Sequence, residues 1–462
     1  MASKKNRRNR KVARTRVIDS MTMINPNTAG IDVGSEEHWV CVPSDRAEEN
    51  VRPFGVYSCD FRELAGWLKK CGVTSVAMES TGVYWIPLYQ VLEKQGFDVV
   101  LVNARHLKSV AGRPKTDPND CQWIQRLHSY GLLNASFRPE NDICVLRSLQ
   151  RHRDELTEST SRHVLHIQKS LQQMNVRLDE AVSDIMGKTG LAIIEAILSG
   201  EHNPSRLAKL RDSRVKADER EIAKALDGDY REEHLFVLRQ SLESYKFIYG
   251  QMEVCDREIK KHLEELEKKV DANLNPLPPP TAGSKRSNRN QPTYDIRPYL
   301  YESFGVDLTQ VPGFQSSTVL TLLSEVGPDL DAWPTDKRFA SWLGLCVNKE
   351  ISGGKILRNS TRKVKNRASE AFRMAASSLK SSECHLGVFY RRIKSRRGAP
   401  KAVTATAHKL AVIFYHMVKE GKPYKELDLS RYYEDYRKKT LRNLKNRAQS
   451  LGFELVPVAV NM

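Results

Sequence analysis

The sequence lacks the cysteine patterns that mark a metal-bound or disulfide-linked domain. Its eight cysteines are scattered, with no CxxC pair and no Cys/His cluster at zinc-binding spacing. This argues against a zinc finger or a disulfide scaffold and is typical of a reducing compartment. No apolar run approaches the roughly 18 residues of a membrane span, and the basic N-terminus MASKKNRRNRKVARTR lacks the apolar segment of a signal peptide. We therefore expect a cytoplasmic protein without membrane contacts.

Acidic residues are also in deficit, with 56 Asp and Glu against 74 Lys and Arg and a formal net charge of +18. Such an excess of positive charge is typical of a protein with a polyanionic partner, above all nucleic acid. A chain of 462 residues is too long for one ordinary core, so two or three domains are expected. Residues 1–26 are predicted to form a disordered basic arm that follows phosphates without reading bases.

Residues 27–140 show the pattern of an α/β domain. Short strands are expected in TAGIDVG, HWVCVPS and VRPFGVYS, followed by an amphipathic helix in FRELAGWLKKCG. The chain then alternates between the strand SVAMES, the helix YWIPLYQVLEKQG, the strand DVVLVN and the helix DPNDCQWIQRLHSYGLL. Three leading strands followed by this alternation indicate an antiparallel meander extended by parallel crossovers, with helices packed on the sheet.

The remainder of the chain is predicted to be mainly helical. Residues 141–272 carry two long apolar stripes of coiled-coil spacing, which indicate either an antiparallel helical arm or a dimerising coil. Residues 273–294 are rich in Pro, Ser and Asn and are predicted to form a linker. Residues 295–425 are predicted to form a helical module and residues 426–462 a basic tail. Within the module, VPGFQSSTVLTLLSEVGPDL predicts a Pro-Gly turn feeding a helix, either a phosphate-binding helix-hairpin-helix element or an ordinary helix entry.

Four carboxylates occupy the ends of predicted elements in the first domain. Asp32 ends the first strand, Glu79 ends the fourth, and Asp117 and Asp120 open the helix that follows the fifth. If the first and fourth strands are neighbours, both carboxylates emerge at one sheet edge beside the i, i+3 pair. Helix capping by Asp117, with Pro118 at the first helical position, is the simpler explanation of that pair. Clustered carboxylates repel by about 1–4 kcal/mol per close pair, so they favour a hard counter-ion such as Mg²⁺.

A second candidate site combines serine, glycine and cations. Ser352 precedes two glycines, which let the backbone approach a ligand closely, although a serine beside glycine is usually a turn residue. No His/Asp partner stands nearby in the sequence, so a protease-like triad is not supported. The surrounding cations suit a phosphate-rich ligand. The residues predicted to bind nucleic acid are Lys355, Arg358, Arg362, Lys363, Lys365, Arg367, Arg391, Arg392, Arg396 and Arg397.

The segments GIDVGSEEHWV, AMESTGVYW and KTDPNDCQW resemble the three blocks of DEDD transposases of the insertion-sequence 110 family. The segments VPGFQSSTVLTLLSEVG, RFASWLGL, SGGK and APKAVTATAHKLAVIFYHMV are similar to the transposase module of the same family. The resemblance covers roughly residues 28–135 and 300–420. It implies a RuvC-like domain of ribonuclease-H fold in residues 27–140, a mainly α-helical transposase domain in residues 295–425, and a coiled-coil region between them.

The same resemblance implies roles for individual residues. Asp32, Glu79, Asp117 and Asp120 correspond to the ligands of a two-metal site for Mg²⁺, with Mn²⁺ as a substitute. Ser352 corresponds to the nucleophile, and Ser360 is the second candidate. The sequence departs from the family pattern at Ile351, where many members have a small polar residue, and at Cys121, where alanine is common.

The implied function is that of a DNA recombinase that cuts and rejoins strands through a covalent phosphoserine. The implied partners are donor and target DNA, a structured bridge RNA, and further copies of the chain, assembled as a dimer or tetramer through the coiled coil. The implied location is the nucleoid of a bacterial or archaeal cell. One alternative is a metal-dependent Holliday-junction-type nuclease, in which the carboxylates do the chemistry and the C-terminal module only binds. Another is a non-catalytic nucleic-acid scaffold whose carboxylates act as helix caps.

Overall fold

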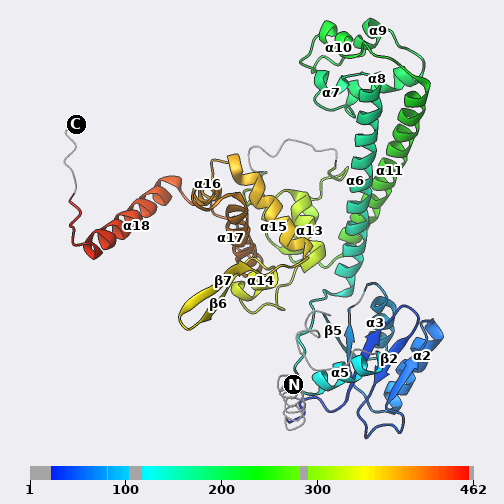
Figure 1. Cartoon of the computed structure of the whole chain (residues 1–462), viewed down its shortest axis with the longest axis vertical. Helices are drawn as coiled ribbons and strands as arrows, with labels where there is room; N and C mark the ends of the chain where they lie inside the picture. The colour runs from blue at the N-terminus through cyan, green and yellow to red at the C-terminus, as the bar shows by residue number, and fades with distance from the viewer. Residues whose placement is uncertain (1–21, 81, 104–116, 281–289, 457–462) are drawn as a thin grey trace, which may run out of the picture. The chain divides into compact units, whose positions relative to one another are not determined.

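The computed structural model describes residues 22–80, 82–103, 117–280 and 290–456 (Figure 1). The chain divides into two compact units, Met1–Arg138 and Pro139–Met462, here called unit 1 and unit 2. Most of the predicted basic arm, the middle of the predicted linker and the chain just before Asp117 lie outside the described residues. All eight cysteines are free thiols. Among the helices of the described segments, none combines the length and the apolar character needed to span a bilayer.

Unit 1 is built on a five-stranded mixed sheet with the strand order β3-β2-β1-β4-β5. The strands are β1 (Thr28–Val33), β2 (His38–Cys41), β3 (Val51–Phe54), β4 (Ser75–Glu79) and β5 (Asp98–Val102). Neighbours are antiparallel from β1 to β3 and parallel from β1 through β4 to β5. The predicted antiparallel meander with parallel crossovers is therefore confirmed, and the first and fourth strands are neighbours.

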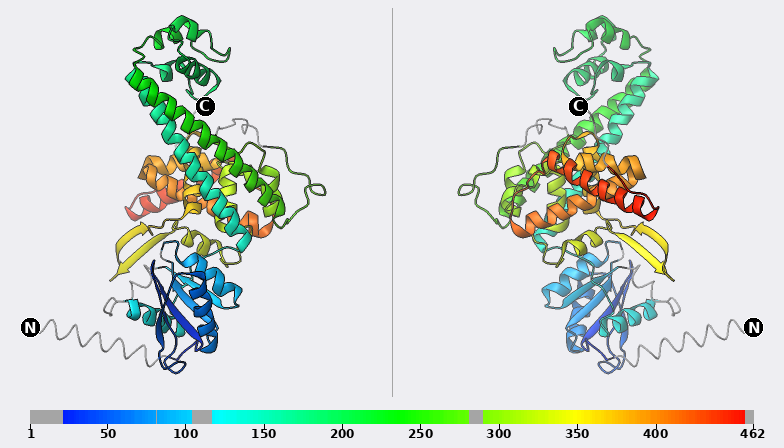
Figure 2. Two further views of the ribbon diagram at one scale, coloured as in Figure 1. Left: turned by 90° about the vertical axis from the view of Figure 1, so that its right-hand side faces the viewer. Right: turned by 90° about the vertical axis from the view of Figure 1, so that its left-hand side faces the viewer.

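Helices cover both faces of this sheet. Helices α2 (Ser58–Lys70) and α3 (Trp85–Lys94) enclose the main core with the β1 residues Ala29, Ile31 and Val33. Helix α5 (Asp117–Ser129) lies across the opposite face, where its apolar side chains pack on β4 and β5 (Figure 2). Because side chains alternate along a strand, the even-numbered residues of β1 face α5.

The third strand is shorter than predicted. It ends at Phe54, and α2 already begins at Ser58, inside the stretch VRPFGVYS that was expected to be extended. The Asp60 carboxylate accepts a hydrogen bond from the backbone N–H of Tyr57 at 3.0 Å. This contact satisfies one of the backbone donors that have no partner at a helix start. The helix therefore begins earlier than the apolar pattern predicts.

Unit 2 begins with a helical arm. The two long helices expected from the apolar stripes are α6 (Asn141–Gln173) and α11 (Glu232–Glu265), which lie side by side (Figure 1). Thr160 of α6 contacts Met252 of α11, and the carbonyl of Asp142 lies 2.7 Å from the His262 ring. An earlier residue of α6 thus contacts a later residue of α11. The two helices are therefore antiparallel, and both belong to one chain.

A small helical cap joins the two arm helices at one end (Figure 1). It contains α7 (Leu178–Ala181), α8 (Lys188–Leu198), α9 (Pro204–Ala208) and α10 (Glu219–Ala225). Its core residues Ile193, Leu207 and Leu226 are buried with Leu171 of α6 and Leu238 of α11. This segment was predicted to belong to the arm, and the core that it shares with the ends of α6 and α11 was not predicted.

The C-terminal module is mostly helical, as predicted. Its helices are α12 (Arg297–Phe304), α13 (Ser316–Val326), α14 (Asp336–Trp342), α15 (Arg367–Ser378), α16 (His385–Arg397) and α17 (Ala399–Glu420), with single turns η1 (Leu308–Gln310) and η2 (Leu379–Ser381). Phe304, Phe339, Phe372 and Phe414 form its buried aromatic centre. The predicted Pro-Gly turn is present, because Gly313 has a φ of +91° just before α13.

Two features of the mainly helical module and the basic tail were not predicted. The segment around the glycine pair forms a β-hairpin of β6 (Val347–Ser352) and β7 (Lys355–Thr361), and most of the tail forms helix α18 (Leu429–Ser450). The start of the predicted linker also has fixed contacts. The carbonyls of Pro278 and Pro279 accept hydrogen bonds from Arg297 at 2.5 Å and from Gln310 at 3.0 Å.

Candidate catalytic sites

Helix α5 packs along strand β1 and runs in the opposite direction. The hydroxyls of Thr28 and Ser129 are 2.8 Å apart at one end of the contact. At Gly30, an added Cβ would lie 2.2 Å from the backbone nitrogen of Gln125 and 2.4 Å from the carbonyl oxygen of Cys121. Two strand residues span about 6.7 Å and one helical turn about 5.4 Å. Each step of two along β1 therefore corresponds to about one turn toward the N-terminus of α5.

This correspondence locates Asp32. It is the next residue after Gly30 on the α5 face of β1, and the next turn of α5 begins at Asp117. Asp32 is half-buried there. The pKa of the Cys121 thiol is raised mainly by a hydrogen bond with the Cys41 thiol and by burial. The negative charge of Asp32 raises the same pKa further. Asp32 and the first turn of α5 are therefore electrostatic neighbours.

The parallel pairing of β1 with β4 locates Glu79. Gly30 is paired with Ala77 and Ile31 with Met78, so the same register continued by one residue sets Asp32 opposite Glu79. Neighbouring strands are about 4.8 Å apart. Ala77 packs against Ile124 and Leu127 of α5, so Glu79, two residues further along β4, faces the same helix. The parallel neighbours β1 and β4, on which the prediction for Asp32 and Glu79 depends, are present.

Asp120 occupies the stripe of α5 that faces the sheet. Ile124 and Leu127 follow it at i+4 and i+7, and these three side chains are buried, Asp120 with 7% of its surface exposed. Asp117 is one turn earlier and exposed. Helix α5 is described from Asp117 onward, so Asp117 and Asp120 both lie in its first described turn.

The donor set at this end of the sheet consists of carboxylates, which suit a hard cation such as Mg²⁺. Within the described part of the chain, no three His, Cys, Asp or Glu side chains stand close enough to hold one metal ion. The sheet register and the position of α5 thus bring the four residues to one place, whereas their carboxylates are not arranged as a finished metal site.

Gly30 was not singled out in the sequence analysis, although it sets the distance between β1 and α5. Any side chain there would collide with the backbone of α5, which cannot give way as a flexible side chain can. The signal in the sequence is a glycine inside the apolar strand TAGIDV. Glycine inside a strand often marks the close approach of another backbone.

Ser352 lies at the tip of the β6–β7 hairpin. Gly353 and Gly354 form its two-residue turn, with φ values of +55° and +77°. Both residues thus need positive φ, which matches the type I′ turn favoured by two-residue hairpins and explains the glycine pair. Ser352 is exposed and opposite Lys355 in the register.

Ser360 shares the hairpin with Ser352. The register pairs Glu350 with Arg358 and Asn348 with Ser360, so these side chains lie on one face of the ribbon. Arg358 donates a hydrogen bond from Nε to Ser360 Oγ at 3.0 Å and is 3.8 Å from the Glu350 carboxylate. Arg358 therefore already engages the second candidate serine.

Some of the predicted nucleic-acid-binding cations form contacts within the protein, and most of them are exposed to solvent. The half-buried Arg367 forms a 2.7 Å ion pair with Asp154 of the arm, and Arg391 donates a 2.6 Å hydrogen bond to the carbonyl of Ser382. These two contacts have a structural role. The cations that are exposed to solvent are Lys355, Arg358, Arg362, Lys363, Lys365, Arg391, Arg396 and Arg397.

Arg392 and Arg396 of α16 connect to α18 through one aromatic ring. The Arg392 guanidinium lies 4.4 Å from the centre of the Tyr436 ring and 5.7 Å from that of Phe389. Arg396 donates a hydrogen bond to the Tyr436 hydroxyl. Such cation–π contacts stabilise the approach of two basic helices, so these arginines position α18 against α16.

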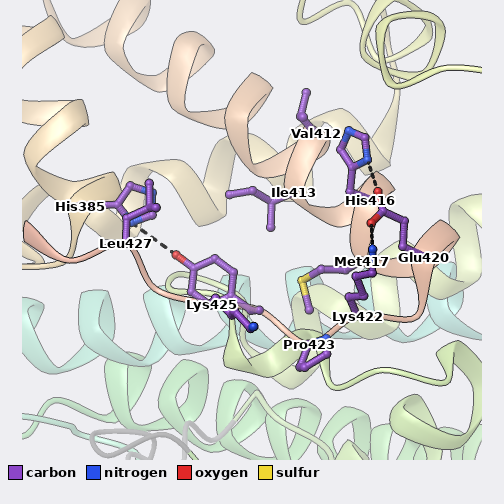
Figure 3. Close-up of a pocket in the computed structure, with 11 residues that line it drawn as sticks. His385, Val412, Ile413, His416, Met417, Glu420, Lys422, Pro423, Lys425 and Leu427 are labelled. Carbon is purple, nitrogen blue, oxygen red and sulfur yellow. Dashed lines mark hydrogen bonds and ion pairs between the residues drawn. The ribbon is translucent and has the colours of Figure 1, made fainter. Parts of the chain in front are cut away.

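A pocket of about 290 Å³ opens beside α17 and the segment that follows it (Figure 3). His416 Nδ1 and Lys422 Nζ each lie 2.9 Å from the Glu420 carboxylate at its rim. The lining residues are His385, Val412, Ile413, His416, Met417, Glu420, Lys422, Pro423, Tyr424, Lys425 and Leu427. None of the predicted site residues is in this lining.

Two family models match the chain. Residues 29–176 match a transposase model of the DEDD type of the IS110 group, and residues 307–391 match the Transposase IS116/IS110/IS902 family. The chain belongs to the IS110 family of transposases. The first match contains all four carboxylates of this transposase, and the second contains Ser352 and the hairpin. No curated protein matches the transposase sequence. The resemblance stated from the motifs is confirmed, and the protein is a DNA transposase, an enzyme of DNA recombination.

Proposed function

We propose that this transposase cuts and rejoins DNA by metal-assisted phosphoryl transfer, on a unit 1 of ribonuclease-H-like fold. Asp32, Glu79, Asp117 and Asp120 are the proposed ligands of Mg²⁺, and Ser352 is the proposed nucleophile. The observation that carries the proposal is the register that sets Asp32 opposite Glu79 beside the first turn of α5. Carboxylates from three separate elements gain nothing from this proximity unless a cation offsets their repulsion.

The proposed reaction has two steps. Ser352 Oγ loses its proton to solvent and bonds to phosphorus, while the leaving deoxyribose oxygen separates and takes up a proton, which leaves a phosphoserine. A second deoxyribose hydroxyl then bonds to the same phosphorus, and Ser352 Oγ leaves and regains a proton. Bound Mg²⁺ would stabilise the negative charge that develops on the phosphoryl oxygens. Lys355, on the same face as Ser352, is positioned to bind the phosphate.

The proposed partners follow from the positive charge and the family. The exposed cations of unit 2 suit the phosphates of DNA and of a structured guide RNA, and the arm offers a surface through which copies of the chain can associate. The proposed carboxylate site belongs to unit 1 and the serine to unit 2. Both must reach one phosphate, so the reaction requires the two units, from one chain or from two, to meet on the DNA.

A metal-dependent junction nuclease is the second candidate function. All four carboxylates lie within one compact unit, so that unit has the composition of a complete two-metal site without the serine. In this alternative the hairpin binds DNA and forms no covalent bond.

The deciding experiment compares serine and carboxylate variants of the full-length protein, with its co-purified RNA and DNA carrying the ends of its element. Ser352→Ala is expected to abolish the covalent protein–DNA adduct on a denaturing gel and to lower strand transfer by at least about 10³-fold. Asp32→Asn is expected to lower cleavage by about 10²–10³-fold at any Mg²⁺ concentration. Ser450→Ala and Glu36→Gln, which change exposed residues outside the proposed sites, are the matched controls and should remain active.

The outcomes separate the candidates. Cleavage that survives in Ser352→Ala and disappears in Asp32→Asn identifies the nuclease. An adduct that is lost in Ser360→Ala, with Ser352→Ala unaffected, transfers the nucleophile to the second serine. Full activity of both Ser352→Ala and Asp32→Asn would refute the enzymatic proposal for these residues.

A further inference from the structure

The β6–β7 hairpin projects from the helices of unit 2 as a free two-stranded ribbon (Figures 1 and 2). Every residue of its two strands is exposed except Thr361, which is half-buried. A two-stranded hairpin without a covering layer is at best marginally stable in water. A ribbon of this kind gains order when one of its faces is covered by a ligand.

The ribbon carries large aliphatic side chains beside the proposed nucleophile. Ile351 and Ile356 are directly opposite each other and are 60% and 56% exposed. Leu357 is the additional residue of a β-bulge, because the register shifts after Glu350, and it is 69% exposed. We call Ile351, Ile356 and Leu357 the aliphatic cluster. No covering side chain buries it in the described structure, and its exposure to water is unfavourable.

We propose that the aliphatic cluster is a DNA wedge, which inserts between base pairs next to the phosphate that Ser352 attacks and thereby kinks the duplex. Leucine and isoleucine are among the side chains that proteins insert into base steps from the minor groove, with nearby cations on the phosphates. This inference rests on the proposed function, because it assumes that Ser352 reaches a DNA phosphate.

The position of the cluster in the ribbon supports DNA as the occupant. Ile351 is adjacent to Ser352, about 3.4 Å along the strand, and its side chain projects from the opposite face. When Ser352 Oγ contacts a backbone phosphate, the cluster lies beside the same duplex. Aliphatic groups form no hydrogen bonds with base edges, so they are buried best where a base step opens.

The charge of the ribbon favours DNA over a protein partner. Lys349, Lys355 and Arg358 flank the aliphatic cluster, with Glu350 as the acidic residue paired to Arg358. Lysine is depleted in protein–protein interfaces, whereas clustered Lys and Arg are the usual ligands of phosphates. An aliphatic tip framed by cations is the composition expected of a wedge between two phosphate strands.

The kink would serve the reaction. Opening a base step turns the adjoining sugar–phosphate backbone outward and makes room for a protein side chain in line with a scissile bond. The wedge residues thus act as positioning residues for Ser352 and not as catalytic residues. They also favour sites that contain a flexible step such as TA, which is easily unstacked.

The test uses the full-length protein with Ser352→Ala, so that the DNA stays uncut. The probe is a short duplex with one TA step, 2-aminopurine beside that step and a fluorescence pair at its ends. Binding is expected to raise 2-aminopurine fluorescence and to shorten the end-to-end distance. Adding Ile351→Ser and Leu357→Ser is expected to remove both signals at saturation and to weaken binding about tenfold. A nick at the TA step, which makes the kink easy, should restore most of the lost affinity.

Two controls keep the test specific. Met374→Ser removes an apolar side chain of similar exposure, 71%, from α15, and should leave both signals unchanged. Lys355→Ala should weaken binding and lower its salt dependence by about one phosphate contact, while the fluorescence change persists at saturation. Thermal melting followed by circular dichroism verifies that each variant is folded.

If both signals persist in the variant that carries Ile351→Ser and Leu357→Ser, the wedge proposal is wrong. A change of oligomeric state in that variant by light scattering would also overturn it, since a second copy of the chain would then cover the aliphatic cluster. The measurement involves no chemistry, so it can fail while Ser352 is still shown to form an adduct. Equally, kinking can persist when the adduct assay fails, and the two proposals are therefore distinguishable.

Discussion

At the scale of single residues, His38 is the most unusual group in the sheet of unit 1. It is 1% exposed and stacked on Phe61 with ring centres 5.5 Å apart. Neither ring nitrogen has a hydrogen-bond partner among the described residues. A charged imidazolium is unfavourable in such surroundings, and burial lowers the pKa of His38 from its ordinary value of 6.5.

Because His38 is buried, we expect the folding stability of unit 1 to decrease in acid. The folded state binds the proton less readily than the unfolded state, so stability is fully present above about pH 6.5. It then falls by up to about 1.4 kcal/mol per pH unit as the pH decreases below that value. Burial lowers the pKa of His128 as well, which acts in the same direction. Hydrogen exchange of the β1 and β2 amides at about pH 7 and about pH 5 measures the effect.

His38→Phe provides the test of that assignment. Phenylalanine keeps the stacking on Phe61 and removes the titration, so the acid-induced loss of protection should become smaller. His416→Phe, which changes a side chain that is 51% exposed, is the control and should leave the pH dependence unchanged. An unchanged pH dependence in His38→Phe would contradict the role of His38.

At the scale of elements, the contact of α5 with β1 determines how Asp117 and Asp120 lie relative to Asp32. Gly30→Ala places a methyl group 2.2 Å from a backbone atom of α5, so the helix must shift. We expect unit 1 to lose about 1–3 kcal/mol of stability. Strand cleavage should fall by about 10²-fold, because a displacement of about 1 Å at a catalytic site has this effect. Urea unfolding and a cleavage assay measure the two effects.

Gly66→Ala is the matched control for this prediction. Gly66 lies in α2, and a Cβ there would meet nothing within 4 Å. Alanine in a helix interior is more favourable than glycine by up to about 1 kcal/mol, so this variant should be equally or more stable and fully active. Wild-type cleavage by Gly30→Ala would show that α5 does not need its close contact with β1.

The two arm helices are held together by a buried ion pair as well as by their apolar stripes. Arg153 of α6 donates hydrogen bonds to Asp256 of α11, and both side chains are almost completely buried. A third hydrogen bond from Arg153 reaches the carbonyl of Asn290 at 3.0 Å. The pair thus connects α6, α11 and the chain that enters the C-terminal module.

Asp256→Ala is expected to destabilise the arm by about 3–5 kcal/mol, because it leaves the Arg153 guanidinium buried without its counter-charge. Glu180→Ala breaks the exposed pair between Arg177 and Glu180 and should leave the unfolding midpoint almost unchanged, because solvent screens exposed pairs. Urea unfolding followed by circular dichroism compares the two variants. Equal midpoints would show that the buried pair contributes little to the arm.

At the scale of the whole molecule, the net charge of +18 predicts strongly salt-dependent binding to DNA and RNA. If six to ten phosphates are neutralised, affinity should fall by about 10³–10⁵-fold between about 50 and 200 mM salt. A titration of the full-length protein against labelled duplex at several salt concentrations measures this slope. A flat response would show that the exposed cations of unit 2 are not the binding surface.

Much of this architecture could be predicted from local patterns. The strands and helices of unit 1 follow from short apolar runs and helix-terminating glycines, and the arm helices follow from long apolar stripes. The end of β3 could not be predicted, because the Asp60 side chain starts α2 early. The β6–β7 hairpin was also missed, since its strands are exposed on both faces and show no alternation of apolar and polar residues.

The sequence by itself determined the types of element, the positive charge, the family, and the carboxylate and serine candidates, because these depend on neighbouring residues and on short motifs. Only the tertiary structure decided which of those residues lie at the same end of the sheet. The pairing of β1 with β4 and the close contact of α5 at Gly30 bring Asp32, Glu79, Asp117 and Asp120 to one end of the sheet. Such proximity depends on strand register and backbone contact between distant segments, which no local pattern encodes.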